Sequence, residues 1–544
     1  MPDLQPVPMR EPFTENEIKK AVSKLKANKS AGFDDISVEL VKYAPNELHN
    51  QITTIFNKIA SQGDCTIKIN HGILVPIQKP GKAKGPPSNL RPITLLLTLR
   101  KILAVAIMIR IGERMDHEIP ISQAAYRKER STTEHVFAVK MIIERTLNAK
   151  NETIYLTLLD MSKAFDTIPR KDLIEDLSET IELDELFIVK KMLEVLLSLR
   201  CGNSLSETFV TDTGTPQGDC ASANNFTYYL AKSLGERTST LQPDQLAEHS
   251  YHTCTQIDHI NLELEYADDI TKVTSDHNNM ERYVEEKPVT LQTKGLTVNK
   301  DKTEKYIINR NQNEWRKCKL LGTILDSKED MKRRKILAIT AANNLNHLFD
   351  NDKLTLATKL KIVDVYIEPI FLYNSETWTL NKADEETIDT FHRKLLRRYV
   401  FNVKWPNTIS NEVLYRRSKA ESWRKKVTRR RLKWFGKLAN LPNEVPANQA
   451  LKYALADFSK PRGKPKTTWV SKVKKDLQSM NFTWDNAILF AKENQNDGYE
   501  LLPNSLKTCL EKIPKSYTTS LVPLLTPILR PIALFTNPLI LRLI

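Results

Sequence analysis

The hydrophobic pattern of the first 330 residues predicts β-strands that end at polar residues. Residues 71–97, HGILVPIQKPGKAKGPPSNLRPITLLL, read as a strand, a Lys/Gly/Pro-rich loop and a second strand. Residues 154–159 are a mostly apolar run that ends at Asp160. Short β-prone runs precede and follow Asp268 and Asp269, which indicates a hairpin with these two aspartates at its tip.

Helical patterns alternate with these strands. Thr14 and Glu17 have the spacing of a capping box that opens a first helix. Residues 100–115 predict another helix, and residues 214–234 read as a glycine turn followed by a helix. The polar motifs therefore fall on strand ends and turns, where a scaffold presents reactive groups.

From about residue 330 onward the pattern changes to long helical periodicity with denser positive charge. One apolar stripe consists of Ile388, Phe391, Leu395 and Tyr399. Residues 416–438 contain eleven Lys and Arg against the single acid Glu421. Because Trp423 and Trp434 stand at helical spacing, we expect them to fill the core rather than to stack on bases. We expect a boundary near residues 330–350.

The length of the chain predicts several domains, and its net charge favours a polyanionic binding partner. The chain of 544 residues is too long for one ordinary domain. Its 81 Lys and Arg exceed its 66 Asp and Glu, which gives a net charge of +15. This excess favours nucleic acid as the first partner and an acidic membrane surface as the second, although a solvated basic surface would look the same.

The cysteines and the two ends of the sequence bear on the compartment. The six cysteines contain no CxxC pair, which indicates free thiols in a reducing environment. The first residues lack an apolar run typical of a signal peptide, so we expect an intracellular protein of the nucleus or cytoplasm, not a secreted one. Residues 518–544 are apolar but contain four prolines and Arg530, which favours a foreign or read-through tail over a membrane anchor.

Three aspartates are candidates for one metal site. If the strand that ends at Asp160 lies beside the hairpin that carries Asp268 and Asp269, the three carboxylates meet at one edge of a sheet. Phosphoryl transfer to a nucleic-acid 3′ hydroxyl needs such an arrangement, because two Mg²⁺ ions about 3.5–4 Å apart require hard oxygen ligands. The alternative is a solvated turn at Asp268 and Asp269 with Asp160 as a helix cap.

A second cluster of metal-binding residue types occurs between the strand motifs. His249, His252, Cys254 and His259 are close in sequence. Their spacing matches no familiar zinc pattern, so a variable hairpin connection is favoured over a zinc site.

Four motifs in order carry a family resemblance: LLDMSKAFDTI, GTPQGD, YADD and GLTVNKDKTE. With them the sequence resembles the reverse transcriptases of non-LTR retrotransposons, from Lys26 to Asp326 and more weakly through WFGKLANLP and GKPKTTW. The resemblance implies an α+β right-hand polymerase with fingers, a palm with an antiparallel sheet, a helical thumb and a helical basic C-terminal region. It implies RNA-directed DNA synthesis with an RNA template (the element's own RNA), a DNA primer, dNTPs and two Mg²⁺ ions, with Mn²⁺ as a substitute. A separate endonuclease is a further expected partner, and a membrane is not.

The resemblance also assigns roles by position. Asp160, Asp268 and Asp269 match the catalytic metal ligands, and Lys302 matches a proton donor to the leaving pyrophosphate. The matched nucleotide-binding residues are Lys79, Arg91, Phe165, Gln217 and Gly218. Phe165 would exclude a 2′-hydroxyl, unless it is an ordinary core aromatic. The expected nucleic-acid contacts are Lys101, Arg127, Arg130, Ser131, Arg429, Arg430 and Arg431.

The sequence also departs from the family's pattern. Residues 32–35 read Gly-Phe-Asp-Asp where the family has Gly-Pro-Asp-Gly, and residues 220–223 read Cys-Ala-Ser-Ala where it has Pro-Leu-Ser-Pro. Ala124-Ala125 likewise replaces a Gly/Phe-type pair. None of these changes removes a carboxylate. They support, as an alternative, a catalytically decayed or domesticated nucleic-acid-binding relic. A group II intron maturase ranks third, because no HNH-type end is visible.

The expected domains follow from these motifs. Residues 1–60 are expected to form an N-terminal helical extension of the fingers, and residues 61–345 the fingers and palm. Residues 346–485 are expected to form the thumb and basic C-terminal region, followed by a weakly ordered or foreign apolar tail at residues 486–544.

Overall fold

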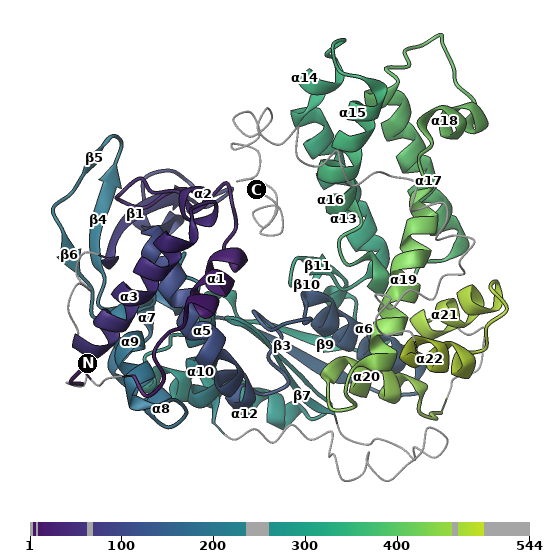
Figure 1. The fold of residues 1–544 in the computed structure, drawn as a ribbon. Coiled ribbons are helices and arrows are strands. Elements are labelled where there is room, and N and C mark those ends of the chain that lie inside the picture. Colours follow the sequence, from purple (N-terminus) through teal and green to yellow (C-terminus); the bar gives the residue numbers. More distant parts are fainter. Residues whose placement is uncertain (1–3, 7–8, 63–68, 236–259, 460–465, 494–544) are drawn as a thin grey trace.

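A computed structural model describes residues 4–6, 9–62, 69–235, 260–459 and 466–493. Among them a small sheet with helices lies on one side, a four-stranded sheet in the middle, and a long helical part on the other side (Figure 1). This arrangement confirms the α+β class. The histidine–cysteine cluster at residues 249–259 and the apolar tail lie outside the described residues.

The first helices that the structure describes share one buried cluster. They are α1 (Glu15–Lys24), α2 (Val38–Lys42) and α3 (Asn46–Gln62). The predicted capping box is confirmed, because the Thr14 side chain accepts a hydrogen bond from the Glu17 amide and Glu17 bonds back to the Thr14 amide. Arg110 also donates to the Glu17 carboxylate at 2.7 Å, and this hydrogen bond lowers the pKa of Glu17 to about 2.

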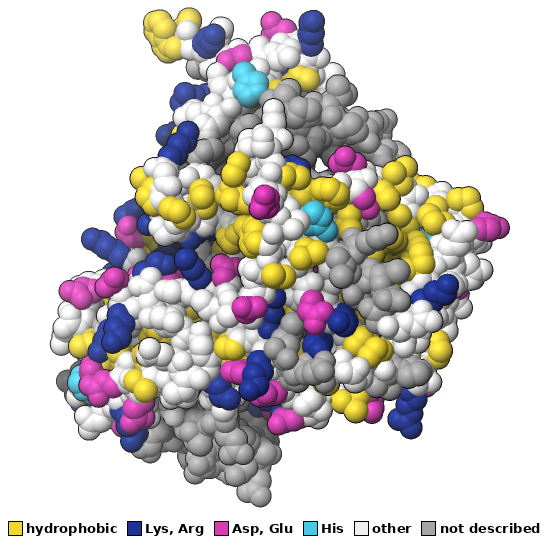
Figure 2. All heavy atoms as spheres, turned by 90° about the vertical axis from the view of Figure 1, so that its left-hand side faces the viewer, with side chains coloured by type: hydrophobic (Ala, Val, Ile, Leu, Met, Phe, Trp, Pro, Cys, Tyr) yellow, Lys and Arg dark blue, Asp and Glu magenta, His cyan; other side chains and the backbone are white. Residues whose placement is uncertain are grey.

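The small sheet contains the predicted strand–loop–strand segment. Its strands are β1 (His71–Gln78), β2 (Leu90–Leu96), β4 (Leu196–Cys201), β5 (Ser204–Leu205) and β6 (Phe209–Val210). β1 pairs antiparallel with β2, across the basic loop and the 3₁₀ turn η1 (Pro87–Asn89), and parallel with β4. Figure 2 shows apolar side chains gathered on this outer face of the molecule. Exposed large hydrophobic side chains on α2, β5 and β6 are Leu40, Leu205, Phe209 and Val210.

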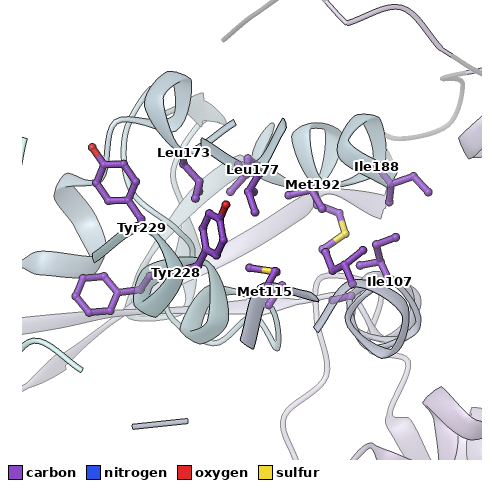
Figure 3. Packing of buried hydrophobic residues seen from close by; sticks show 14 of the residues in the cluster. Ile107, Met115, Leu173, Leu177, Ile188, Met192, Tyr228 and Tyr229 are labelled. Atoms are coloured by element: carbon purple, nitrogen blue, oxygen red, sulfur yellow. The ribbon is translucent and has the colours of Figure 1, made fainter. Parts of the chain in front are cut away.

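Beneath this sheet a helical core joins segments far apart in sequence. It comprises α5 (Thr98–Glu118), α8 (Arg170–Ser178), α9 (Leu183–Leu193) and α10 (Ser222–Leu234). Apolar side chains of these helices, including Met115, Leu177, Met192 and Tyr228, pack together (Figure 3).

The four-stranded sheet, which we call the palm sheet, has the strand order β7-β8-β3-β9, with neighbours antiparallel. Its strands are β3 (Ile154–Asp160), β7 (Asn261–Tyr266), β8 (Asp269–Thr274) and β9 (Glu304–Ile308). Ile154 and Leu156 of β3 belong to the same buried cluster as α6 (Thr132–Asn148), whereas α12 (His277–Thr293) packs on β3 and β8. The apolar run at residues 154–159 therefore forms a central strand between two helical layers.

Short elements connect the palm sheet to its surroundings. They are α7 (Ala164–Thr167), η2 (Lys300–Lys302), η3 (Glu314–Lys317), β10 (Lys319–Leu320) and β11 (Thr323–Ile324).

The helical part begins at residue 327 and has its own core. Its elements are α13 (Ser327–Asn344), α14 (Asn346–Phe349), α15 (Leu356–Ile362), η4 (Val363–Ile367), α16 (Glu368–Phe371), η5 (Ser375–Thr377), α17 (Lys382–Leu395), η6 (Leu396–Val400), α18 (Asn411–Ser418) and the first half of α19 (Trp423–Asn440). The predicted stripe from Ile388 to Tyr399 is buried in this core, as is Trp423.

The C-terminal helices pack on the palm and not in that core. α20 (Pro446–Leu455), α21 (Trp469–Gln478) and α22 (Trp484–Glu493) share a buried cluster with α6 and the second half of α19. Phe137 of α6 meets Trp434 and Trp469 edge to face, with ring centroids 5.5 and 4.7 Å apart. Residues 346–485 thus contribute to two separate cores, and the expected boundaries at 60, 345 and 485 stay predictions. None of the helices described is long and apolar enough to cross a membrane.

Candidate active site

Two of the predicted aspartates lie on neighbouring strands of the palm sheet. Asp160 ends β3 and stands directly opposite Asp269, the first residue of β8. Residues opposite each other on antiparallel strands have Cβ atoms about 4.5–5.5 Å apart. Asp268 follows Ala267 in the two-residue turn that joins β7 to β8. The hairpin expected from the alternation is therefore present, and its turn lies beside the end of β3 that carries Asp160.

A buried glutamine holds this turn. The Gln123 side-chain oxygen accepts hydrogen bonds from the amides of Ala267 and Ala125, each at 3.0 Å. The backbone beside it pairs with β7, because the Ala124 amide donates to the Glu265 carbonyl at 3.0 Å. Ala267 has a φ of 54°, a left-handed conformation that costs free energy in a residue other than glycine. The hydrogen bond to Gln123 stabilises that conformation.

Lys302 reaches the same edge from the next segment. Its Nζ lies 2.7 Å from Oδ2 of Asp160. The chain before it follows the end of β3, with the Ser162 amide donating to the Thr297 carbonyl and the Asn299 amide to the Asp160 carbonyl, both at 2.8 Å. Backbone pairing therefore places the Lys302 ammonium beside the Asp160 carboxylate.

The surroundings of Asp268 and Asp269 raise the pKa of both carboxyl groups. Burial, with a contribution from the Asp160 charge, raises the pKa of Asp268 above its ordinary value. Enclosure by protein atoms together with the charges of Asp268 and Asp160 raises the pKa of Asp269 to about 7, although its side chain is still solvent-exposed. Lys302 opposes both shifts only in part. The site therefore has a surplus of negative charge that a cation would relieve.

The donor chemistry fits Mg²⁺, because all three side chains offer hard oxygen ligands and one of them is open to solvent. As the side chains stand, no three His, Cys, Asp or Glu groups among the described residues are arranged around a single point as metal ligands. The cation in contact with Asp160 is the Lys302 ammonium.

Phe165 lies on α7, the short helix that follows β3. Its ring stacks on Phe226 with centroids 4.4 Å apart and meets Tyr126 edge to face at 6.3 Å. The side chain is half-buried, so it belongs to the core on one side and presents an edge to solvent on the other.

Gln217 and Gly218 lie between α7 and β2. The Gln217 side chain donates to Oδ1 of Asp166 at 2.9 Å, and its carbonyl accepts from the Thr94 amide at 2.7 Å. Gly218 has a φ of 122°, and a Cβ there would lie 2.5 Å from the Thr94 carbonyl oxygen. Glycine is required at this position both for its backbone conformation and for the close approach of β2.

The predicted triphosphate-binding residues follow β1 and lie on β2. Lys79 donates to the Ser88 carbonyl at 2.9 Å. Burial raises the pKa of Asp166, and the positive charge of Lys79 opposes this shift in part. Arg91 is exposed on β2, opposite Ile77. Lys82 and Lys84 are exposed in the loop between the strands.

Several predicted nucleic-acid contacts also bond within the protein. Arg127 donates to both carboxylate oxygens of Asp116, at 2.7 and 2.8 Å. Arg130 donates to Glu134, and the Ser131 amide also donates to Glu134, at 3.2 Å, at the start of α6. Lys101, another predicted nucleic-acid contact, donates to the Ser30 carbonyl at 3.3 Å.

The arginine run on α19 needs a correction. Arg431 is 1% exposed and pairs with Asp476 of α21 at 2.7 Å, so it has no open path to a phosphate. Arg430 donates to the Leu372 carbonyl at 2.7 Å and Arg429 to Glu421. Successive residues of a helix point about 100° apart, so three arginines in a row cannot all face the same side. Arg431 lies on the stripe of the buried residues Val427 and Trp434. The prediction for Arg431 was wrong, and this arginine holds α19 to α21.

Sequence reasoning missed two residues that position the site, Gln123 and Asp166. Gln123 opens the segment Gln123-Ala124-Ala125-Tyr126, which we call the QAAY segment. Asp166 directly follows Phe165, and its carboxylate is the acceptor for Gln217. Both residues act through contacts with residues more than 50 positions away in the sequence. The pattern of neighbouring residues does not reveal such contacts.

Comparisons with known proteins agree with the resemblance to reverse transcriptases. The family model described as "Reverse transcriptase (RNA-dependent DNA polymerase)" matches residues 77–325. The probable RNA-directed DNA polymerase from transposon X-element of Drosophila melanogaster is 28% identical over 212 residues, which cover 38% of this chain and 23% of that protein. The RNA-directed DNA polymerase from mobile element jockey of Drosophila funebris is 26% identical over 267 residues, or 48% of this chain and 28% of that protein. The chain thus spans about a quarter of the length of these curated relatives.

Among solved structures, telomerase from Candida tropicalis in complex with a fragment of telomeric RNA covers 79% of this chain and 71% of its own, at 14% identity and a TM-score of 0.37. Telomerase from Candida albicans, in a similar complex, has 11% identity and a TM-score of 0.34.

Proposed function

We propose, from the premise that residues 77–325 form a reverse transcriptase domain of the non-LTR retrotransposon type, that this chain extends a DNA primer on an RNA template. The observation that carries the proposal is the register of the palm sheet. It sets Asp160 opposite Asp269 and puts Asp268 in the adjoining turn. Intact carboxylates at one sheet edge are what nucleotidyl transfer requires of a protein.

Asp160, Asp268 and Asp269 would hold the Mg²⁺ ions. When bound, the ions supply charge stabilisation for the attacking and leaving oxygens of an in-line displacement at the α-phosphate. The raised pKa of Asp269 means that a bound divalent cation competes with a proton for this carboxylate.

The other side chains would bind and orient the nucleotide. Arg91 offers a planar fork for phosphate oxygens and Lys79 a point charge. Phe165, held against Phe226, would overlap a 2′-hydroxyl and so select dNTPs. Lys302, whose Nζ pairs with Asp160, would donate a proton to the leaving pyrophosphate.

The test is primer extension by the full chain on an RNA template with dNTPs and Mg²⁺. Asp268→Asn should reduce the rate at least a hundredfold, because it removes a charged metal ligand. Asp301→Asn is the matched control, since Asp301 is an exposed aspartate of η2 outside the carboxylate group. Equal rates for the parent and Asp268→Asn would refute the site assignment.

The second candidate function is a nucleic-acid-binding relic, which the altered loops at residues 32–35 and 220–223 favour. No incorporation by the parent chain, with binding to an RNA–DNA hybrid retained, would establish this alternative. The helix after the second loop, α10, forms without the family's prolines, and the Ser222 hydroxyl donates to the Pro216 carbonyl at 2.8 Å.

A further inference from the structure

Trp405 is 93% exposed, the highest value among the exposed large hydrophobic side chains described. Five of the chain's seven tryptophans are at most 5% exposed: Trp315, Trp378, Trp423, Trp434 and Trp469. Tryptophan carries more apolar surface than any other side chain, so the fold normally gains by burying it. An exposed one indicates a surface that binds something.

The loop that presents Trp405 is tied at its base. The Val403 amide donates to the Arg397 carbonyl at 2.9 Å, and the Arg397 guanidinium donates to the Ile409 carbonyl at 3.1 and 2.9 Å. The loop and α18 lie at the end of the helical part away from the palm sheet (Figure 1). Trp405 therefore stands on a closed loop and not on a free end of the chain.

The surroundings of the loop are basic. Residues 397–419 contain a single acid, Glu412. The exposed cations of this segment are Arg398, Lys404, Arg416, Arg417 and Lys419. The Asn407 amide donates to the Lys404 carbonyl at 2.9 Å, so Lys404 and Trp405 belong to one turn.

A flat aromatic ring among cations fits a nucleic-acid strand whose bases are unpaired. Such a strand offers a base to stack on the ring and phosphates for the cations, and neither interaction depends on sequence. In a duplex the bases are already stacked on each other. An amphipathic membrane-binding surface would instead need several exposed apolar side chains beside the cations.

We propose that the loop at Trp405, with Lys404, is a binding site for single-stranded nucleic acid in which an unpaired base stacks on the indole ring. The site lies on the helical part and is distinct from the carboxylates of the palm sheet. The proposal does not depend on polymerase activity. Binding of oligonucleotides to this site can be measured without dNTPs.

The test is fluorescence anisotropy of the full chain with labelled oligonucleotides: single-stranded RNA, single-stranded DNA, a blunt RNA–DNA hybrid and a hybrid with a single-stranded overhang. Trp405→Ala should weaken binding of both single strands and of the overhang hybrid roughly tenfold, as one lost base–aromatic stack would. Binding of the blunt hybrid should not change. The single strand whose affinity falls more in Trp405→Ala identifies RNA or DNA as the preferred ligand.

Conservative and control variants separate stacking from charge. Trp405→Phe should keep most of the affinity, whereas Lys404→Gln should weaken binding and lower the salt dependence. Ile336→Ala is the matched control, because Ile336 is 66% exposed on α13 and its truncation should change nothing.

Equal affinities of the parent and Trp405→Ala for single strands would overturn the proposal. An equal loss for blunt and overhang hybrids would also overturn it, because the contact would then not involve an unpaired base. Unchanged nucleic-acid binding with lost binding to anionic vesicles would assign the loop to a membrane instead.

Discussion

Asp160 carries two opposing contacts: repulsion from Asp268 and Asp269, and attraction from Lys302 at 2.7 Å. This balance explains how three carboxylates can share one sheet edge in a folded chain. The ammonium neutralises one charge, and the protonation of Asp269 near neutral pH removes another. Residues at this edge therefore respond to pH and to divalent cations together.

The first prediction concerns Asp269 and Mg²⁺. The pKa of its carboxyl is raised to about 7 from an ordinary 3.8, so the folded protein binds this proton more tightly than the unfolded chain. Its contribution to stability is complete below pH 3.8 and is lost as the pH rises toward 7. Mg²⁺ should therefore raise the melting temperature more at pH 8 than at pH 5.5. Asp269→Asn should abolish most of the difference, while Asp301→Asn keeps it. An equal Mg²⁺ effect in both variants would contradict this role of Asp269.

The second prediction concerns Asp166 as a positioning residue. Asp166→Ala removes the acceptor of the Gln217 side chain and should raise the KM for dNTPs roughly tenfold, with a smaller change in kcat. Asp166→Asn keeps an acceptor oxygen and should recover most of the loss. Steady-state kinetics on a primed RNA template measure both constants. A KM in the Asp166→Ala variant equal to the parent's would show that Gln217 needs no such support.

At the scale of elements, the site depends on three close approaches. The turn after β3 meets the glycine turn at residues 214–218, the same glycine turn meets β2, and the QAAY segment meets the hairpin of β7 and β8. Each approach includes a hydrogen bond between backbone groups: Thr215 to Phe165, Thr94 to Gln217, and Ala124 to Glu265. Side chains add to two of them, through Gln217 and Gln123.

The third prediction tests the contact between Gly218 and β2. Gly218→Ala should destabilise the fold by about 1–3 kcal/mol, because the new Cβ would meet the Thr94 carbonyl oxygen and φ is positive. Gly85→Ala is the control, since Gly85 has a φ of 113° but nothing within 4 Å of an added Cβ. Urea unfolding of both variants isolates the cost of the contact. Equal losses would mean that backbone conformation alone requires glycine at Gly218.

At the scale of the whole molecule, α19 connects two cores. Its first half is buried among the helices of the helical part, and its second half joins α6, α20, α21 and α22 against the palm sheet. The palm sheet is therefore packed against helices that come from the far end of the described chain. The arginine run on α19 contributes to this assembly through Arg431.

The fourth prediction concerns the ion pair of Arg431 and Asp476. Asp476→Asn removes the nearer charge partner of a buried guanidinium and leaves Glu385 at 3.9 Å, so it should cost about 1.5–3 kcal/mol in unfolding free energy. Arg431→Met combined with Asp476→Leu should cost much less, because both charges are then absent. A double-mutant cycle in urea gives the coupling energy. A cost for Asp476→Asn below about 0.5 kcal/mol would mean that solvent screens the pair.

The sequence by itself determined three strands of the palm sheet (β3, β7 and β8, but not β9), the capping box at Thr14, the hairpin that carries Asp268 and Asp269, and the resemblance to reverse transcriptases. These features are local, because strand period, capping and turn chemistry depend on neighbours within a few residues. Only the tertiary structure decided that Lys302 pairs with Asp160, that Gln123 and Asp166 support the site, and that Arg431 is buried while Trp405 is exposed. Such outcomes depend on which distant segments pack together, and neither charge nor hydropathy at a single position specifies them.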